Sequence, residues 1–281
     1  MTLVQTGSLL SAARAEKRAV AAFNVITLEH AEGIVAGAER AGQPVILQIS
    51  ENAVKFHEGC VLPIARAVHA MAEAADVPVS LHLDHVEHDA LLRQATDAGF
   101  SSVMFDASHA SYTENVERTR RAADWAHTNG LLIESELGQV GGKDGVHLGA
   151  HEPGARTDPD EATAYVASTG VDALAVAVGS SHAMTERTAG LDFALIERLR
   201  DAVPVPLVLH GSSGVPDDDL AKGVRAGIVK VNIGTALNMA YTGAVRSFLS
   251  DDAKTVDPRK FLTPARVALA ETVAQLIGVI S

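Results

Sequence analysis

Short runs of β-branched and apolar residues alternate along this chain with longer segments whose apolar residues recur at helical spacing. Helical spacing is clear in residues 113–128 and 192–202. A strand, a helix of this length and a second strand form a parallel βαβ unit. The predicted strands are residues 19–25, 44–50, 78–84, 101–107, 131–138, 173–179, 206–211 and 228–234.

About eight such repeats predict an α/β fold closed into a (β/α)8 TIM barrel rather than an open sheet. The 281 residues suit a single barrel domain spanning residues 1–281. Residues 1–19 predict an opening amphipathic helix, and Asp257-Pro258 begins one extra C-terminal helix that runs towards Ile280. Glycines before four strands are expected to end helices in the left-handed conformation, namely Gly42, Gly99, Gly170 and Gly227.

The longest break in the alternation covers residues 139–160, which are rich in Gly, His and Asp. A loop of this length in a compact domain is usually functional. We therefore expect it to take part in the chemistry of the barrel.

The net charge is −12 and the sequence pI is about 5.4. An acidic protein repels nucleic acid and anionic membranes, so neither is an expected partner. We see no membrane-length apolar run and no signal peptide. The single cysteine, Cys60, excludes an internal disulfide and predicts a reducing cytoplasm. A nucleophilic role for Cys60 is less favoured than an inert one.

Polar residues gather where the predicted strands end, and in a barrel these ends face one catalytic mouth. A lone histidine at a strand end is more often a hydrogen-bonded surface group. Acids or histidines from five strands on one rim are harder to explain in that way. The rim residues are Asn24, Gln48, Ser50, His82, Asp84, His85, Asp106, Glu134, Glu136, His182, His210 and Asn232.

Three rim histidines, His85, His182 and His210, follow the third, sixth and seventh strands. Three imidazoles with an open fourth position is the geometry of catalytic zinc, which acts as a Lewis acid on a substrate oxygen. His82 alternates with Asp84, so we expect it to point into the barrel as packing or as support for a ligand.

Rim carboxylates have two candidate roles. Asp84, next to His85, is favoured as the group that exchanges a proton with substrate, although it could instead orient an imidazole. Asp106 and Glu136 lie on adjoining strand ends and could hold a second, looser divalent ion.

Glycine-rich loops follow strands seven and eight, where barrels usually bind phosphate. They read His210-Gly211-Ser212-Ser213-Gly214 and Asn232-Ile233-Gly234-Thr235. Glycine lets backbone N–H groups close on an anion, and helix N-termini favour negative charge. Together they predict a phosphorylated substrate.

The ordered motifs resemble the class II, metal-dependent fructose-bisphosphate and tagatose-bisphosphate aldolase family over nearly the whole chain. The motifs are Ala22-Phe23-Asn24-Val25, Leu83-Asp84-His85, Glu134-Ser135-Glu136-Leu137-Gly138, Gly141-Gly142, Val178-Gly179-Ser180-Ser181-His182, Leu209-His210-Gly211, Lys230-Val231-Asn232 and Asp257-Pro258-Arg259-Lys260.

The resemblance implies reversible cleavage of a ketose 1,6-bisphosphate in a homodimer or homotetramer. It implies catalytic zinc on the three histidines, a second divalent ion on Asp106 and Glu136, and proton exchange at the C4 oxygen by Asp84. A monovalent cation is a further candidate cofactor. The implied substrate-binding residues are Asn24, Ser50, Gly179, Ala183, Gly211, Ser212, Ser213, Asn232, Ile233, Gly234, Thr235 and Arg259.

Three segments depart from the family pattern. The usual second asparagine of the first-strand motif is replaced by Ile26 or Thr27. After His182 the chain reads Ala183-Met184-Thr185-Glu186-Arg187, where relatives usually have glycine and then a lysine. The Gly-Gly loop is short and carries Asp144 in place of the usual glutamate. We therefore predict that Asp144 handles the C3 proton, with Glu134, Glu136 or a metal-bound water as alternatives.

Three rival readings remain. Lys230 could form a Schiff base, but Asn232 shares its strand face and the histidines would then have no purpose. A related lyase could act on another phosphorylated ketose or a deoxy sugar acid. A non-catalytic metal- or phosphate-binding relative is disfavoured by Asp84 beside the three histidines.

Overall fold

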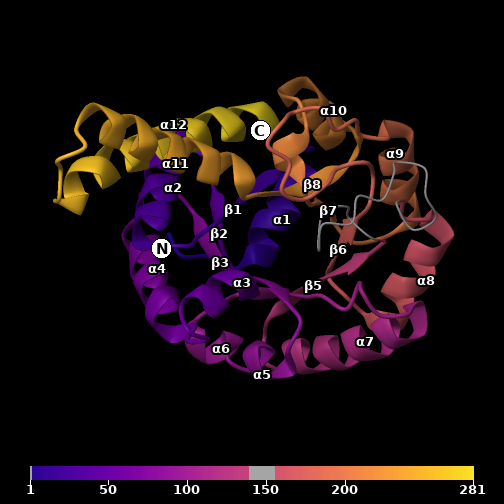
Figure 1. The fold of residues 1–281 in the computed structure, drawn as a ribbon. Coiled ribbons are helices and arrows are strands. Elements are labelled where there is room, and N and C mark those ends of the chain that lie inside the picture. Colours follow the sequence, from indigo (N-terminus) through magenta and orange to yellow (C-terminus); the bar gives the residue numbers. More distant parts are fainter. Residues whose placement is uncertain (1, 139–155) are drawn as a thin grey trace.

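A computed structural model describes residues 2–138 and 156–281. Within them, parallel strands pair in chain order and close into a barrel, because β1 pairs with both β2 and β8 (Figure 1). The predicted (β/α)8 barrel is confirmed. Its strands are β1 (Val20–Asn24), β2 (Val45–Ser50), β3 (Val79–Val86), β4 (Ser102–Phe105), β5 (Leu132–Leu137), β6 (Ala173–Val176), β7 (Leu207–Leu209) and β8 (Ile228–Ile233).

Helices follow the strands and cover the outside of the barrel (Figure 1). The glycines expected after four of them all have positive φ, between 62° and 142°. The helices are α1 (Thr6–Ala15), α2 (Leu28–Ala41), α3 (Glu51–Phe56), α4 (Leu62–Ala74), α5 (Asp89–Leu92), α6 (Ala95–Ala98), α7 (Tyr112–Thr128), α8 (Pro159–Thr169), α9 (Phe193–Ala202), η2 (Ser212–Gly214), α10 (Asp217–Ala226), α11 (Thr235–Asp251) and α12 (Pro258–Ile280).

Strand β6 ends at Val176, three residues before the predicted end at Gly179. The cause is Thr157, which occupies the backbone groups of the next residue. Thr157 Oγ1 accepts the N–H of Ala177 at 2.8 Å, and the Thr157 N–H donates to the Ala177 carbonyl at 3.0 Å. The chain beyond Val176 is therefore free to leave the sheet and enter the loop that carries His182.

Helix α1 closes the N-terminal end of the barrel. Its buried side chains Leu9, Leu10 and Ala13 pack in one cluster with strand residues that point inwards, among them Ile46 and Val208. The backbone N–H of Val4, just before the helix, donates to the Val79 carbonyl at 2.9 Å. The predicted N-terminal helix thus seals the barrel, and the opposite end stays available for a site.

The last helix packs lengthwise on α2 (Figure 1). Two glycines of α2 permit the close approach: a Cβ on Gly33 would lie 2.8 Å from Leu269 Cδ2, and one on Gly37 would lie 2.6 Å from the Ala270 carbonyl oxygen. The N–H of Ala19 donates to the Ile280 carbonyl at 3.1 Å. The predicted C-terminal helix therefore packs against α2, and its last turn is hydrogen-bonded to the residue that precedes β1.

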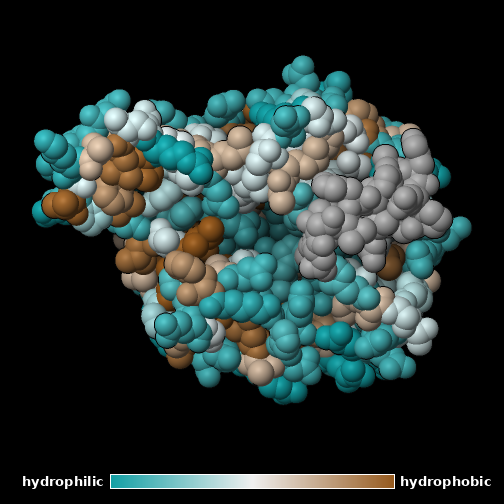
Figure 2. Space-filling model, viewed as in Figure 1, coloured by the Kyte–Doolittle hydropathy of each residue, from teal (hydrophilic) through white to brown (hydrophobic). Residues whose placement is uncertain are grey.

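Helix α11 and the start of α12 form an arm that projects from the barrel (Figure 1). Of the 17 residues of α11, only Leu237 is buried, and apolar Met239 and Val256 are 49% and 93% exposed. Figure 2 shows hydrophobic residues, in brown, at the outer end of the arm. None of the helices in the described part of the chain has the length and apolarity needed to cross a membrane.

Candidate active site

A cleft of about 810 Å³ opens at the C-terminal ends of the strands, visible as the central hollow in Figure 2. Most of the predicted substrate residues line it. The predicted residues among its lining are Asn24, Ser50, Asp84, His85, His182, Ala183, Gly211, Ser212, Ser213, Asn232, Gly234 and Thr235. The structure therefore brings together residues from distant parts of the sequence in one cleft.

A bulge at the end of β3 turns two neighbouring side chains towards this cleft. Successive strand residues normally point to opposite faces. The β3–β4 register shifts between Leu83 and Val86, and His85 has a φ of +49°. This left-handed conformation, unusual outside glycine, lets Asp84 and His85 both line the cleft.

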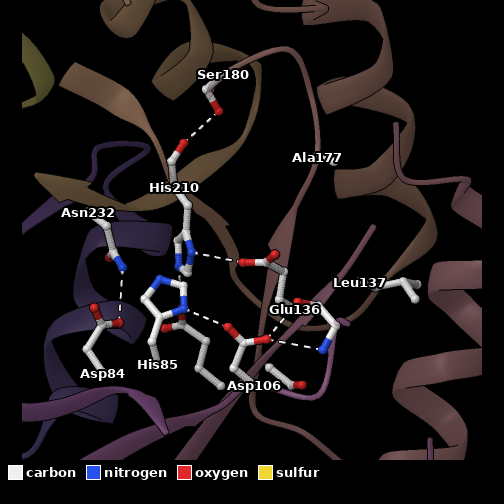
Figure 3. Close-up of polar contacts among 12 residues, drawn as sticks. Asp84, His85, Asp106, Glu136, Leu137, Ala177, Ser180, His210 and Asn232 are labelled. Carbon is white, nitrogen blue, oxygen red and sulfur yellow. Dashed lines mark hydrogen bonds and ion pairs between the residues drawn. The ribbon is translucent and has the colours of Figure 1, made fainter. Parts of the chain in front are cut away.

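The imidazole of His85 is fixed by a carboxylate from the next strand. Its Nδ1 lies 2.8 Å from Asp106 Oδ2 (Figure 3). The other oxygen of Asp106 accepts the Ser108 backbone N–H at 3.1 Å and the Ser108 hydroxyl at 2.6 Å. Asp106 is 2% exposed, so this hydrogen bond orients the His85 ring and leaves Nε2 available for the site.

His210, at the end of β7, lies between two buried carboxylates (Figure 3). Its Nε2 is 3.0 Å from Glu134 Oε1, and its Nδ1 is 3.1 Å from Glu136 Oε2. Burial lowers the pKa of His210, but the hydrogen bonds to Glu134 and Glu136 outweigh it and raise the pKa to about 9. This corner of the barrel therefore strongly favours positive charge.

The three predicted histidines converge. Ligand atoms of His85, His182, His210 and Glu136 all lie within 4.8 Å of one another. The ring centroids of the histidines are 4.8 to 5.8 Å apart, with the rings inclined at 68° to 72°. Imidazole nitrogens that face a common point beside a carboxylate are a donor set suited to a divalent transition metal.

The two carboxylates predicted for a second ion do not form a separate cluster among the described residues. Glu136 belongs to the histidine cluster, and Asp106 reaches it through His85. Their assignment to a second ion stays a prediction.

Asp84 is 1% exposed and accepts a hydrogen bond from Asn232 Nδ2 at 3.4 Å (Figure 3). Burial raises its pKa, but the charges of His85, Lys230 and His82 outweigh burial and hold the pKa below its usual value. The carboxyl group therefore stays ionised, as a proton acceptor must be.

Backbone contact between two loops brings His182 towards His210. A Cβ on Gly211 would lie 2.6 Å from the carbonyl carbon of Ser181, and Gly211 has a φ of +68°. The hydroxyl of Ser180 donates to the His210 carbonyl at 2.6 Å (Figure 3). Gly211 is thus required for the close approach of the loops after β6 and β7.

The two predicted phosphate loops are tied together by their serines. Ser212 Oγ donates to the Asn232 carbonyl at 2.6 Å, and Ser213 Oγ accepts the N–H of Ala236, in the first turn of α11, at 3.1 Å. An anion at this end of the cleft would therefore meet a helix N-terminus as well as the loop. Ile233 is buried, so it can contribute only through its backbone.

Other predicted residues lie elsewhere. Gly179 is not part of the cleft lining; a Cβ there would lie 2.2 Å from the Gly190 carbonyl oxygen. Arg259 is on the projecting arm, where its guanidinium pairs with Asp257 at 2.7 Å and is 88% exposed. Asp144 and the Gly141-Gly142 motif lie outside the described residues.

Glu51 and Lys55, on α3, also line the cleft and were not predicted. Glu51 is 5% exposed; its carboxylate accepts the Glu87 N–H at 2.8 Å and lies 2.6 Å from His88 Nδ1 and 3.1 Å from Lys55 Nζ. The spacing of Glu51 and Lys55 by four residues, directly after Ser50, was the available signal. Lys55 is the one lysine or arginine in the described lining of the cleft.

The family model described as fructose-bisphosphate aldolase class-II matches residues 4–281 of the chain. The chain is 39% identical to a fructose-bisphosphate aldolase of Geobacillus stearothermophilus, over 97% of this chain and 95% of the relative. It is 37% identical to one from Staphylococcus aureus (strain Mu50 / ATCC 700699), with the same coverage.

Solved structures agree with these sequence matches. The YdjI aldolase from Escherichia coli K12 superposes with a TM-score of 0.86 at 33% identity, covering 99% of this chain and 97% of the other. A putative fructose-1,6-biphosphate aldolase from Coccidioides immitis gives 0.86 at 29% identity, with 98% and 96% coverage.

Proposed function

The chain belongs to the class II fructose-bisphosphate aldolase family, and from that premise we propose that it reversibly cleaves a ketose 1,6-bisphosphate. The products are dihydroxyacetone phosphate and glyceraldehyde 3-phosphate. The observation that carries the proposal is the convergence of His85, His182 and His210 in one cluster, with Asp84 next to His85 in the lining of the cleft.

The family is metal-dependent, and we assign the catalytic ion, zinc, to the three histidines. Nitrogen ligands from three imidazoles suit zinc, and Glu136 supplies negative charge beside them. When bound, the ion supplies Lewis-acid polarisation of the substrate carbonyl. Asp106 and Glu136 are the candidates for a second divalent ion. A monovalent cation stays a further candidate cofactor, and we assign no residues to it.

Asp84 is our candidate for removing the C4 hydroxyl proton, and cleavage of the C3–C4 bond follows. Its carboxylate is ionised and lines the cleft, and Asn232 holds one of its oxygens. The hydrogen bond from Asn232 favours a fixed orientation of the acceptor, which general-base catalysis needs.

The phosphate next to the ketone is assigned to Gly211, Ser213, Asn232 and Thr235, close to the N-terminus of α11. Lys55 supports an anionic substrate because its ammonium lies at the same cleft. The chain lacks the family's lysine after His182. Arg187 does not replace it in this conformation, because it is not part of the cleft lining and its guanidinium binds Asp217 at 2.5 Å.

Asp144 stays our proposal for the C3 proton. Among the alternatives, Glu134 is disfavoured because it is fully buried and both of its oxygens are engaged, by His210 and Lys230. The same contact disfavours Lys230 as a Schiff-base nucleophile, since its ammonium is buried and ion-paired below the cleft.

We propose a homodimer or homotetramer. The projecting arm supports it, because α11 buries one residue and leaves Met239 half exposed. Arg259 could meet substrate only if the arm of one copy reached the cleft of another. We place the enzyme in the cytoplasm, where its one exposed cysteine, Cys60, would stay reduced.

The decisive experiment measures release of triose phosphate from fructose 1,6-bisphosphate and tagatose 1,6-bisphosphate in a coupled assay. We expect cleavage of at least one, its loss after chelation, and its return with zinc. A zinc-loaded enzyme that cleaves neither would favour another phosphorylated ketose or a deoxy sugar acid. Full activity after complete removal of metal would refute the assignment to the metal-dependent chemistry.

A further inference from the structure

A column of buried polar side chains runs along the barrel axis beneath the cleft. Its members are at most 1% exposed, although they include a lysine and a glutamate. Such groups are rarely buried without a specific partner. From the α1 end to the cleft, the column contains Thr6, Ser102, His82, Lys230 and Glu134.

Donors and acceptors can be assigned along this column, starting from Lys230. Lys230 can only donate, and its ammonium lies 2.7 Å from Glu134 Oε2 and 3.5 Å from His82 Nε2. His82 Nε2 therefore accepts, and its Nδ1 donates to Ser102 Oγ at 2.7 Å. Ser102 Oγ lies 2.7 Å from the hydroxyl of Thr6. The ammonium of Lys230 is thus held by His82 on the α1 side and by Glu134 on the cleft side.

The upper end of the column reaches His210. Because Lys230 binds Oε2 of Glu134, the other oxygen, Oε1, faces His210 Nε2 at 3.0 Å. A carboxylate accepts only, so Nε2 of His210 must carry a proton, and without a metal ion Nδ1 donates to Glu136 in the same way. Glu134 lies outside the candidate metal cluster, so Nδ1 is the nitrogen that would give its lone pair to an ion while Nε2 stays protonated.

Stability alone does not account for this arrangement. The desolvation of a buried ion pair offsets most of its attraction, and apolar residues of similar volume often serve as well. The column instead controls which nitrogen of His210 faces the cluster.

We propose that Lys230 is a positioning residue: acting through Glu134, it holds His210 in the tautomer that offers Nδ1 to the catalytic metal ion. The inference rests on the proposed metal site and adds to it a residue that never touches substrate or metal.

The test compares two variants. The first should lower zinc affinity, and the second substitution, added to the first, should restore it. In Glu134→Gln, the amide oxygen should turn to Lys230 and the NH2 group to His210, which forces the His210 proton onto Nδ1. Zinc affinity should fall about 10- to 100-fold. In Glu134→Gln/Lys230→Met, the amide can turn its oxygen to His210, so affinity should recover at least about tenfold.

Zinc affinity is measured by chelator competition on the full-length enzyme without substrate, so it is independent of which sugar is cleaved. The matched control is Lys222→Met, which removes an exposed ion pair to Asp219 and should leave zinc affinity within about twofold. Affinity of Glu134→Gln within twofold of wild type, or no recovery in the double variant, would overturn the proposal.

A second measurement keeps the test decisive if a variant fails to fold. In zinc-loaded wild-type enzyme with 15N-labelled histidine, His210 should show a proton on Nε2 and the metal shift on Nδ1. The metal shift on Nε2 would overturn the proposal. If zinc does not bind at all, the proposed metal site fails before the positioning role is reached, and the two failures are thereby distinguished.

Discussion

The cleft and the column beneath it are built from the same kinds of residue, yet their surroundings differ. In the cleft, Asp84 and His85 lie at a bulge with a left-handed residue and next to open volume. In the column, His82 and Lys230 lie within strands β3 and β8 and are fully buried.

The difference separates reactivity from support. The ligand atoms of His85, His182 and His210 lie close together and can hold one ion. Both ring nitrogens of His82, in contrast, are used in contacts within the column. Burial and the charge of Lys230 lower the pKa of His82 to about 3, while carboxylates raise that of His210 to about 9. The charges next to each ring, rather than the residue type, therefore decide which imidazole is stabilised in its protonated form.

The strongest way to break the comparison is to remove a cleft histidine. His85→Ala, His182→Ala and His210→Ala should each abolish measurable cleavage and lower bound zinc, because three ligands are needed to hold the ion. Metal content per chain and coupled-assay turnover are measured together. A variant that kept both at wild-type level would remove that histidine from the ligand set.

Asp84 offers the next largest effect. Asp84→Ala, and the isosteric Asp84→Asn, should lose about 10²- to 10⁴-fold in kcat while still binding zinc, because the group acts on a proton. The Asn variant controls for lost packing against Asn232. Loss of zinc in proportion to activity would make Asp84 a support for the metal site instead.

For His82, within the column, we expect an effect on the pH dependence of stability. As pH falls from 6.5 towards 3, unfolded His82 takes up a proton and folded His82 does not, so its contribution lowers the unfolding free energy. His82→Gln should reduce the loss between pH 7 and pH 4.5 by about 2 to 3 kcal/mol. Urea unfolding at both pH values measures this, and an unchanged difference would contradict it.

The smallest effect is expected from a histidine outside both regions. His127 lies at the end of α7 and contacts Asp172 at 3.0 Å, with both side chains more than a third exposed. His127→Gln should change the unfolding free energy by about 0.5 kcal/mol or less and leave kcat unchanged. A large change in either would show that exposure is a poor guide to role in this protein.

Periodic patterns along the chain were sufficient to predict the barrel. Strand runs, the glycine-ended helices and the extra C-terminal helix all follow local rules of spacing and capping, and the structure has them within a few residues. The cleft histidines could also be grouped, because the ends of parallel strands must meet.

Contacts between distant residues could not be predicted in the same way. The bulge at His85 depends on pairing with β4, and the early end of β6 depends on Thr157 reaching back to Ala177. Alternation did place His82 inside the barrel, but not the contact between Lys230 and Glu134, which lie 96 positions apart. Such pairs depend on the closed barrel rather than on neighbours in sequence.

The contact between α2 and α12 has a consequence for the folding of the chain during translation. Ribosomes add about 5–20 residues per second, so α2 emerges roughly 10 to 50 seconds before the helix that covers it. During that interval the strip around Gly33 and Gly37, and the N–H of Ala19, have no partner from their own chain. This strip of α2 therefore stays exposed to other proteins until translation of the final helix is complete.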